Sequence, residues 1–308
     1  MKKSEFIKMK KKRSSVTWMV IAILCIVVCV STASAQIQLT FNPELGKKYE
    51  YRIEAVQNIT QAFMEQEIPM KSEISGIYIS EIKDKTTHEI HTVTSFQEFN
   101  FLISASSFQL GYSSNKPNEN PSEMDNLFEK LFSSIINQPF TVVFAPNGSV
   151  ISVSGMEDII KNMFGAVPAD AQVVEHQVRQ MFSDEIMKNM FEQSSNFYPE
   201  RPVNIGDSWN VDNTTTMNNM SFDIKSKYTL AEINDGLITL EVTGEVEMSM
   251  LETKISGTQS GKIIVDSKTG MPVESDIVQD IKGTIATQGM DISMYMKSET
   301  KVFSRVLN

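Results

Sequence analysis

The chain has 308 residues, of which 41% are hydrophobic, and its 38 Asp and Glu residues outnumber its 28 Lys and Arg residues. The formal net charge of −10 repels phosphate backbones, so we expect no nucleic-acid partner. A chain of this length can bury a large core, as one big domain or two small ones.

The N-terminus has the three-part layout of a secretory signal peptide. Seven Lys and Arg residues lie within residues 2–13, an apolar run follows from Val16 to Val30, and Ala33 and Ala35 offer small side chains to a signal peptidase. We therefore predict cleavage after Ala35, which leaves residues 36–308 as a single exported domain. The alternative is an uncleaved anchor, but the apolar run is shorter than the ~20 residues that cross a bilayer.

Processing would change the chemistry of the chain. Cys25 and Cys29 both lie in the leader, so the mature protein would have no disulfide and no thiolate metal ligand. Loss of the leader leaves 21 basic and 37 acidic residues, a formal net charge of −16. No second apolar run approaches spanning length, so we expect no transmembrane segment in the mature chain. We expect a soluble protein in the periplasm, or outside the cell but associated with the envelope, of a Gram-negative bacterium.

The first mature segment alternates apolar and charged residues from Tyr49 to Ala55, which is typical of a strand with one buried face. Further strands are predicted at residues 73–82 and 88–103. Residues 113–121 are rich in Ser, Asn and Pro and predict a loop.

A helical insert is predicted over residues 122–194. It contains three helices and one hairpin, at residues 122–135, 140–153, 155–164 and 169–194. Ser122 can cap the first helix. The hairpin follows from Asn147-Gly148 between two apolar runs, because both residues tolerate a positive φ.

Residues 209–306 predict a β-meander, in which neighbouring strands are joined by short turns such as 234–236 and 266–270. Long one-sided strands around a central group of helices indicate the α+β class. We predict a large curved antiparallel β-sheet, a half-barrel-like meander, whose apolar face is covered by the helices.

Gly206-Asp207-Ser208 is similar to the nucleophile loop of one class of serine hydrolases. That class places its histidine after the serine, but His88, His91 and His176 all precede Ser208. We interpret Ser208 as a turn residue and expect no catalytic residue; a serine hydrolase is the distant alternative.

His88 and His91 have the spacing of a metal pair only on a helix. On a strand, residues three apart point to opposite faces and cannot share one ion. The sequence contains no phosphate-binding glycine loop and no dinucleotide fingerprint. We therefore expect no metal site and no cofactor.

Methionine is abundant, since 16 methionines remain after loss of the leader. Flexible thioether side chains adapt to irregular apolar partners. We predict an apolar cavity between the sheet and the helices. Its predicted ligand-binding residues are Met248, Met250, Met294, Met296, Phe182 and Met187. The alternative is that these side chains only fill a core.

Two segments resemble an uncharacterised family of exported bacterial β-rich proteins. Residues 199–209 read Pro-x-x-Pro-Val-x-x-Gly-Asp-Ser-Trp, and residues 261–272 contain Asp-x-x-Thr-Gly-x-Pro. The resemblance implies no activity. More loosely, the predicted architecture is similar to the half-barrels of periplasmic lipoprotein carriers, in which a curved sheet and a helical lid hold acyl chains.

The sequence thus favours an exported, non-enzymatic binding protein for an apolar or lipidic ligand in the bacterial envelope. Its expected partner is a hydrophobic small molecule or a lipid. The alternative is an envelope protein of structural or protein-interaction type, with a protein partner and no ligand cavity.

Overall fold

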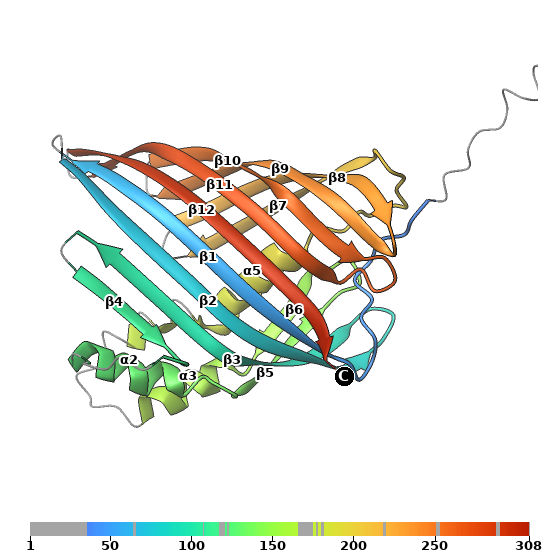
Figure 1. Cartoon of the computed structure of the whole chain (residues 1–308), viewed down its shortest axis with the longest axis horizontal. Helices are drawn as coiled ribbons and strands as arrows, with labels where there is room; N and C mark the ends of the chain where they lie inside the picture. The colour runs from blue at the N-terminus through green and yellow to red at the C-terminus, as the bar shows by residue number, and fades with distance from the viewer. Residues whose placement is uncertain are drawn as a thin grey trace, which may run out of the picture. The chain divides into compact units, whose positions relative to one another are not determined.

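Alternating apolar and polar residues fold most of this chain into long antiparallel strands. In the computed structural model (Figure 1), the Tyr49–Ala55 segment is part of a strand of 16 residues. The structure describes residues 36–63, 66–106, 108–116, 121, 123–165, 175–176, 178–179, 182–217, 220–250, 253–287 and 290–307. The predicted leader falls on residues 1–35, which lie outside this range, and Ile37–Asn308 form a compact unit of their own.

The described residues contain twelve named strands and three named helices. The strands are β1 (Lys48–Phe63), β2 (Gln66–Lys85), β3 (Ile90–Ala105), β4 (Phe108–Ser113), β5 (Pro139–Phe144), β6 (Val150–Ser154), β7 (Ser208–Met217), β8 (Met220–Asn234), β9 (Leu237–Met250), β10 (Thr253–Asp266), β11 (Pro272–Thr287) and β12 (Met290–Leu307). The helices are α2 (Glu123–Ser133), α3 (Met156–Gly165) and α5 (Asp184–Ser195). Among the described residues, none of the helices is long and apolar enough to span a membrane.

All twelve strands belong to one open sheet, so the prediction of a large antiparallel sheet is confirmed. Its strand order is β6-β5-β3-β2-β1-β12-β11-β10-β9-β8-β7, and β4 also pairs with β3. The first and last strands lie side by side in the middle of this order, where Lys48 is opposite Leu307. The two ends of this order are the edge strands β6 and β7, and β4 is a third edge strand, beside β3.

Helix α5 hydrogen-bonds to both β6 and β7. The Glu192 carboxylate accepts the backbone N–H of Val150 on β6. The Gln193 side-chain amide donates to Thr215 Oγ1 on β7 over 3.1 Å. Because strands at opposite ends of the order contact the same helix, the sheet must curve around α5.

Aromatic side chains of the helices pack against one face of the sheet. The ring of Phe191 on α5 lies 5.6 Å from that of Tyr78 on β2. On α2, the ring of Phe132 lies 5.6 Å from that of Phe99 and 5.3 Å from that of Phe101, both on β3. The face of the sheet that carries these residues is called the inward face below.

The sequence prediction of one continuous helix over residues 169–194 is wrong. Within the described residues the helix is interrupted at Ser183, whose ψ of 158° is extended, and α5 begins at Asp184. The Ser183 hydroxyl accepts a hydrogen bond from the backbone N–H of Ile186, as an N-cap residue does. The carboxylates of Asp184 and Glu185, in the first turn, then interact favourably with the positive end of the helix dipole.

Several strands are longer than predicted. β2 begins at Gln66 and not near residue 73, β1 continues beyond Ala55 to Phe63, and β4 is not among the predicted strands. Polar residues such as Gln66 and Lys71 weaken the apolar pattern at the far ends of the strands. Pairing with a neighbouring strand outweighs that weak local preference.

Candidate ligand-binding face

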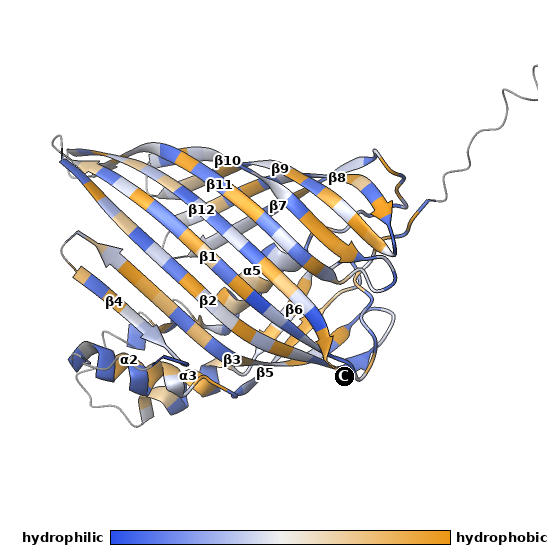
Figure 2. Cartoon of the chain, viewed as in Figure 1, coloured by the Kyte–Doolittle hydropathy of each residue, from blue (hydrophilic) through white to orange (hydrophobic). Residues whose placement is uncertain are grey.

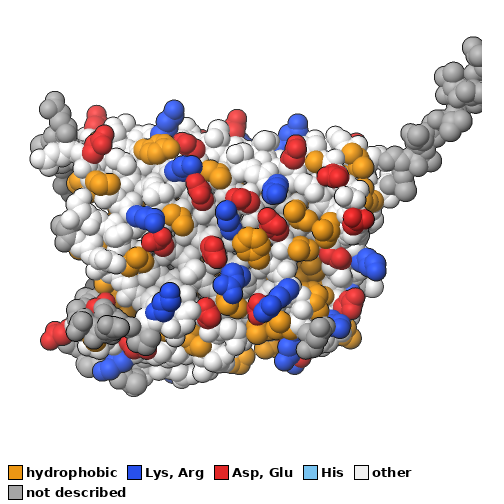
Figure 3. Space-filling view, viewed as in Figure 1, with side chains coloured by type: hydrophobic (Ala, Val, Ile, Leu, Met, Phe, Trp, Pro, Cys, Tyr) orange, Lys and Arg blue, Asp and Glu red, His pale blue; other side chains and the backbone are white. Residues whose placement is uncertain are grey.

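The inward positions of the described strands carry one charged side chain, Lys85, at the end of β2 opposite Ile90. Directly opposite residues of paired strands share a face, so the face follows from the register: Tyr51 is opposite Tyr78, and Tyr78 is opposite Phe96. The alternate, outward positions hold the other ionic residues, including Arg52 and Glu54. Figure 2 shows this alternation along the strands, and Figure 3 shows acidic and basic side chains interspersed over β1, β2 and β12.

The inward face holds two separate groups of buried apolar side chains. The larger group contains Phe96, Phe140 and Leu240 and packs against the helices. The smaller group, here the methionine cluster, consists of the following residues: Val246, Met248, Ile255 and Ile281, with Phe222, Ile224, Ile285, Met294 and Met296 packed against them. It lies toward the hairpin ends of β8–β12.

The six predicted ligand-binding residues do not form one site. Met248, Met294 and Met296 meet in the methionine cluster. Phe182 and Met187 belong to the larger core, where they are 5% and 1% exposed. Met250 is opposite Met220 on an inward position of β9, and its side chain lies outside the described ones.

A row of six uncharged polar residues and one glycine crosses the inward face over seven adjacent strands, in the region between the two apolar groups. Each member is directly opposite the next. From β2 to β8 the row, here called the polar belt, is Ser72, Gln57, Ser298, Gln279, Gln259, Gly244 and Ser226. Sequence reasoning missed it, because its members are spread over seven strands and only the pairing register places them in one row.

The half of the polar belt on β8–β11 is satisfied by its own hydrogen bonds. The Gln279 amide donates to Gln259 Oε1 over 3.2 Å, and the Gln259 amide donates to Ser226 Oγ over 2.7 Å. The second bond crosses a whole strand, β9, at Gly244. A Cβ atom at Gly244 would lie 3.1 Å from Gln259 Cγ, so the glycine provides the room for this crossing.

The other half of the polar belt, on β2, β1 and β12, is unsatisfied by protein groups. Within the described residues, Ser72, Gln57 and Ser298 make no side-chain hydrogen bond. Ser298 is only 5% exposed. No fully buried polar side-chain atom of the described residues lacks a partner, so the Ser298 hydroxyl oxygen is not fully buried.

Apolar side chains remain exposed around this unsatisfied half. On β2, Ile68 is 47% exposed and Ile74 is 39% exposed, although both occupy inward positions. Phe108 on β4 is 51% exposed. We call these three residues and Met70, which is half-buried, the open strip. Contiguous apolar surface of this kind marks a binding site more often than a plain surface.

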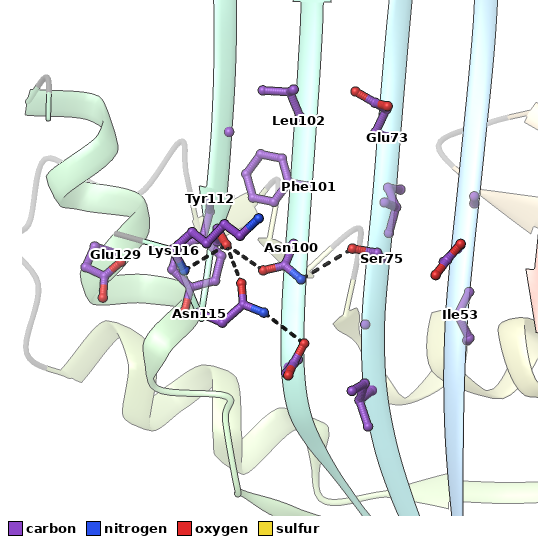
Figure 4. A pocket seen from close by; sticks show the side chains of 18 of the residues that line it. Ile53, Glu73, Ser75, Asn100, Phe101, Leu102, Tyr112, Asn115, Lys116 and Glu129 are labelled. Atoms are coloured by element: carbon purple, nitrogen blue, oxygen red, sulfur yellow. Dashed lines mark hydrogen bonds between the residues drawn. The ribbon is translucent and has the colours of Figure 1, made fainter. Parts of the chain in front are cut away.

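A pocket of about 1120 Å³ lies at β1–β4, the loop after β4 and α2 (Figure 4). Inward residues that line it include Ile74 of the open strip and two small residues, Ala55 and Gly76. Ala55 and Ile74 are directly opposite each other, one inward position along from Gln57 and Ser72. None of the six predicted residues is among its described lining residues.

Outward positions contribute a polar network to the same pocket (Figure 4). Ser113 Oγ donates to Asn100 Oδ1 over 2.8 Å, and the Asn100 amide donates to Ser75 Oγ over 3.3 Å.

Tyr112, which lines the pocket from an inward position of β4, has a raised pKa. Burial, reinforced by the charge of Glu129, raises the pKa of the Tyr112 hydroxyl to about 12. Tyr112 is therefore neutral and able to donate at physiological pH.

A family model matches residues 89–272, which is more than half of the chain, and its description is "Family of unknown function (DUF6263)". The chain belongs to the DUF6263 family. No curated protein matches it.

Three solved structures that match this DUF6263 chain have low sequence identity to it and TM-scores under 0.5. One is described as "lipid-protein interactions in lipovitellin" and has 10% identity and a TM-score of 0.48, with 86% of this chain covered. This chain spans 26% of that one. The COG4313 outer membrane channel from Pseudomonas putida F1 has 8% identity and a TM-score of 0.24, and the match covers 87% of this chain and 98% of the channel. OccK7 (OpdD) from Pseudomonas aeruginosa has 6% identity and a TM-score of 0.24, and the match covers 85% of this chain and 99% of that protein.

The first motif by which the chain resembles its family is a turn that leads into a strand. Gly206 has a φ of +91°, and the Asp207 carboxylate accepts the backbone N–H of Asn204 over 2.9 Å. The Ser208 hydroxyl pairs with Thr229 Oγ1 across the β7–β8 ladder at 2.9 Å. The indole of Trp209 donates to the Phe197 carbonyl over 2.9 Å. Ser208 is thus the first residue of β7, two residues after the turn at Ile205-Gly206, and not a residue of the turn itself as predicted.

His88 and His91 of this chain lie outside the motif at residues 199–209. His88 lies in the connection between β2 and β3, and His91 Nε2 is 2.9 Å from a Glu89 carboxylate oxygen. Among the described residues, no group of three or more His, Cys, Asp or Glu side chains is arranged to hold a metal ion.

The second motif, Asp266–Pro272, is also a turn held by its own side chains. The Asp266 carboxylate accepts the backbone N–H of Thr269 and its hydroxyl, each over 2.8 Å. Burial acts to raise the pKa of Asp266, but these bonds to Thr269 and the backbone N–H of Lys268 hold the pKa below its ordinary value. Tyr198 donates its hydroxyl to the Gly270 carbonyl over 2.7 Å. Both motifs thus serve the fold.

Gly270→Ala should destabilise the protein more than Gly46→Ala. Both glycines have positive φ, of 66° and 77°. A Cβ atom at Gly270 would lie 2.0 Å from the Thr40 carbonyl oxygen, whereas at Gly46 it would meet no atom within 4 Å. We expect urea unfolding to show a loss of about 1 kcal/mol for Gly46→Ala. For Gly270→Ala we expect a further loss of about 1–3 kcal/mol from overpacking. Equal losses would contradict the close approach at Thr40.

Proposed function

We propose that this protein is a non-enzymatic binding protein for an apolar or lipidic ligand, which its leader directs into the bacterial envelope. One observation carries the proposal: Lys85, at the far end of β2, is the single charged residue on the inward positions of the described strands, yet the open strip on this face remains 39–51% exposed at Ile68, Ile74 and Phe108. Elsewhere on this face, similar side chains are buried against the helices. A ligand would complete that burial, with α2 and α5 covering the apolar face of the half-barrel.

The energetics favour a chain-like ligand. Each methylene group that leaves water contributes about 0.8 kcal/mol. A long acyl chain along the open strip and the methionine cluster would therefore be held without any strong polar contact. The ionic outward face would keep the complex in solution.

Native mass spectrometry of residues 36–308, purified without detergent, tests the proposal. We expect an added mass that organic extraction removes, and expect the extracted protein to bind an apolar fluorescent dye. A protein that carries no added mass and binds neither dye nor lipid would sink the proposal and favour an envelope protein that binds a protein partner.

Two substitutions at equally exposed positions locate the binding face. Ile74 is inward and 39% exposed, whereas Phe303 is outward and 40% exposed. We expect Ile74→Lys to lower dye affinity at least about tenfold, because a buried ammonium group must lose its hydration. Phe303→Lys should leave it unchanged. Equal effects of the two variants would place the ligand elsewhere.

A further inference from the structure

We infer that the unsatisfied half of the polar belt, Ser72, Gln57 and Ser298, binds the polar head of an uncharged amphiphile such as an alcohol, ester or amide of a long acyl chain. The inference rests on the proposed function and narrows it to a ligand class. It assigns a binding role to three residues of β2, β1 and β12.

The three residues have unused hydrogen-bonding capacity. A polar group in an apolar surrounding needs a partner, and the β8–β11 half of the belt meets this need within the protein. Ser72, Gln57 and Ser298 lie on the same face and make no side-chain hydrogen bond to a described residue. The Ser298 hydroxyl oxygen is not fully buried, although the residue is only 5% exposed. A serine hydroxyl and a glutamine amide can each donate and accept. Together they suit a ligand group with both functions.

The three residues lie beside the open strip and the pocket. Ser72 lies between Met70 and Ile74 of the open strip along β2, so a polar group there would have apolar surface on both sides. The pocket begins at the next inward pair, Ala55 and Ile74, where Ala55 and the nearby Gly76 leave room above the strand. An acyl chain could occupy this space while its head reaches Gln57.

The three polar residues have no cation beside them on the inward face. A carboxylate or phosphate that is drawn into an apolar site needs a cation, and the neighbouring inward positions on β2, β1 and β12 hold none. Lys85 lies at the far end of β2 and is hydrogen-bonded to Asn42 and Pro43. Arg52 and Lys116 line the pocket, but Arg52 is on an outward position of β1 and Lys116 is in the loop after β4. The site should therefore reject fatty acid anions and accept neutral esters with the same chain.

The test compares monodecanoylglycerol with decanoate at neutral pH, which share one acyl chain and differ in head group, by displacement of an apolar dye from extracted residues 36–308. We expect the ester to bind at least about tenfold more tightly than the anion. The double variant Gln57→Leu/Ser298→Ala should bind the ester about tenfold more weakly, as expected for the loss of two hydrogen bonds, and should bind the dye with unchanged affinity. Asn58→Leu, a change at the adjacent outward position, should alter neither affinity.

Each outcome decides a different question. Equal or tighter binding of decanoate by the unmodified protein would overturn the inference, and this comparison needs no variant. Unchanged ester affinity in the folded double variant would also overturn it. If the unmodified protein binds neither the dye nor either decanoyl compound, the proposed function itself fails. Urea unfolding of each variant shows whether it has folded.

Discussion

Above pH 10, the free energy of unfolding should fall steeply with rising pH, by about 4 kcal/mol per pH unit from three tyrosines together. Tyr51, Tyr78 and Tyr198 lie in the larger core, and burial raises the pKa of each hydroxyl above its ordinary value of 10.0. The unfolded chain loses these protons near pH 10, while the native protein keeps them. Above pH 10 the native state therefore binds more protons than the unfolded chain. The contribution of the three tyrosines to the free energy of unfolding is complete below pH 10 and is lost as the pH rises above it.

Tyr78→Phe isolates this effect, because the Tyr78 hydroxyl makes no hydrogen bond to a described residue. We expect urea unfolding of the variant at a series of alkaline pH values to show about two thirds of the original slope from the three tyrosines. Near pH 8 the two proteins should depend on pH alike, since no tyrosine titrates there. An unchanged alkaline slope in the variant would show that Tyr78 ionises in place.

Phe132→Ala should cost about 3–5 kcal/mol of stability, the range for removal of a buried aromatic ring. Phe132 is 3% exposed, and its ring centre lies between 5.3 and 5.9 Å from those of five other aromatic residues. Three of these are on β3 and β4, one is on α2, and the fifth is Phe182. Loss of this ring would remove the main contact between α2 and the sheet.

Phe303→Ala is the matched control, because Phe303 is an outward residue and 40% exposed. We expect urea unfolding to show a loss of no more than about 1 kcal/mol for this variant. Similar losses for the two variants would mean that α2 contributes little to the core.

Local patterns in the sequence were sufficient for the general fold. The alternation around Tyr49–Ala55 and in the C-terminal meander predicted one-sided antiparallel strands, and a large antiparallel sheet is present. The Asn147-Gly148 turn also lies where it was predicted, between β5 and β6. The interruption at Ser183 could have been read from Ser183-Asp184-Glu185, which has the composition of a helix start.

The polar belt could not be read from any single segment. Its members lie between residues 57 and 298, and only the pairing register places them in one row. The local signal is weak: it is a polar residue among apolar and small residues at the inward positions of a strand, as at Gln259 and Gln279. The methionines are a stronger local signal, and they lie on β9 and β12. The pocket lies instead at β1–β4 and α2, and the role of the methionines in ligand binding stays a prediction.

The pairing of β1 with β12 has a consequence for how the molecule is made. These strands join the two halves of the sheet, so the centre of the structure is formed by the two ends of the described chain. Synthesis proceeds from the N-terminus, so β1–β6 can form early. The pairing of β1 with β12 can form only after β12 has been synthesised. Contacts of such long sequence separation slow folding. A truncation of β12 would therefore divide the sheet into two parts, whereas loss of β6 would remove only an edge.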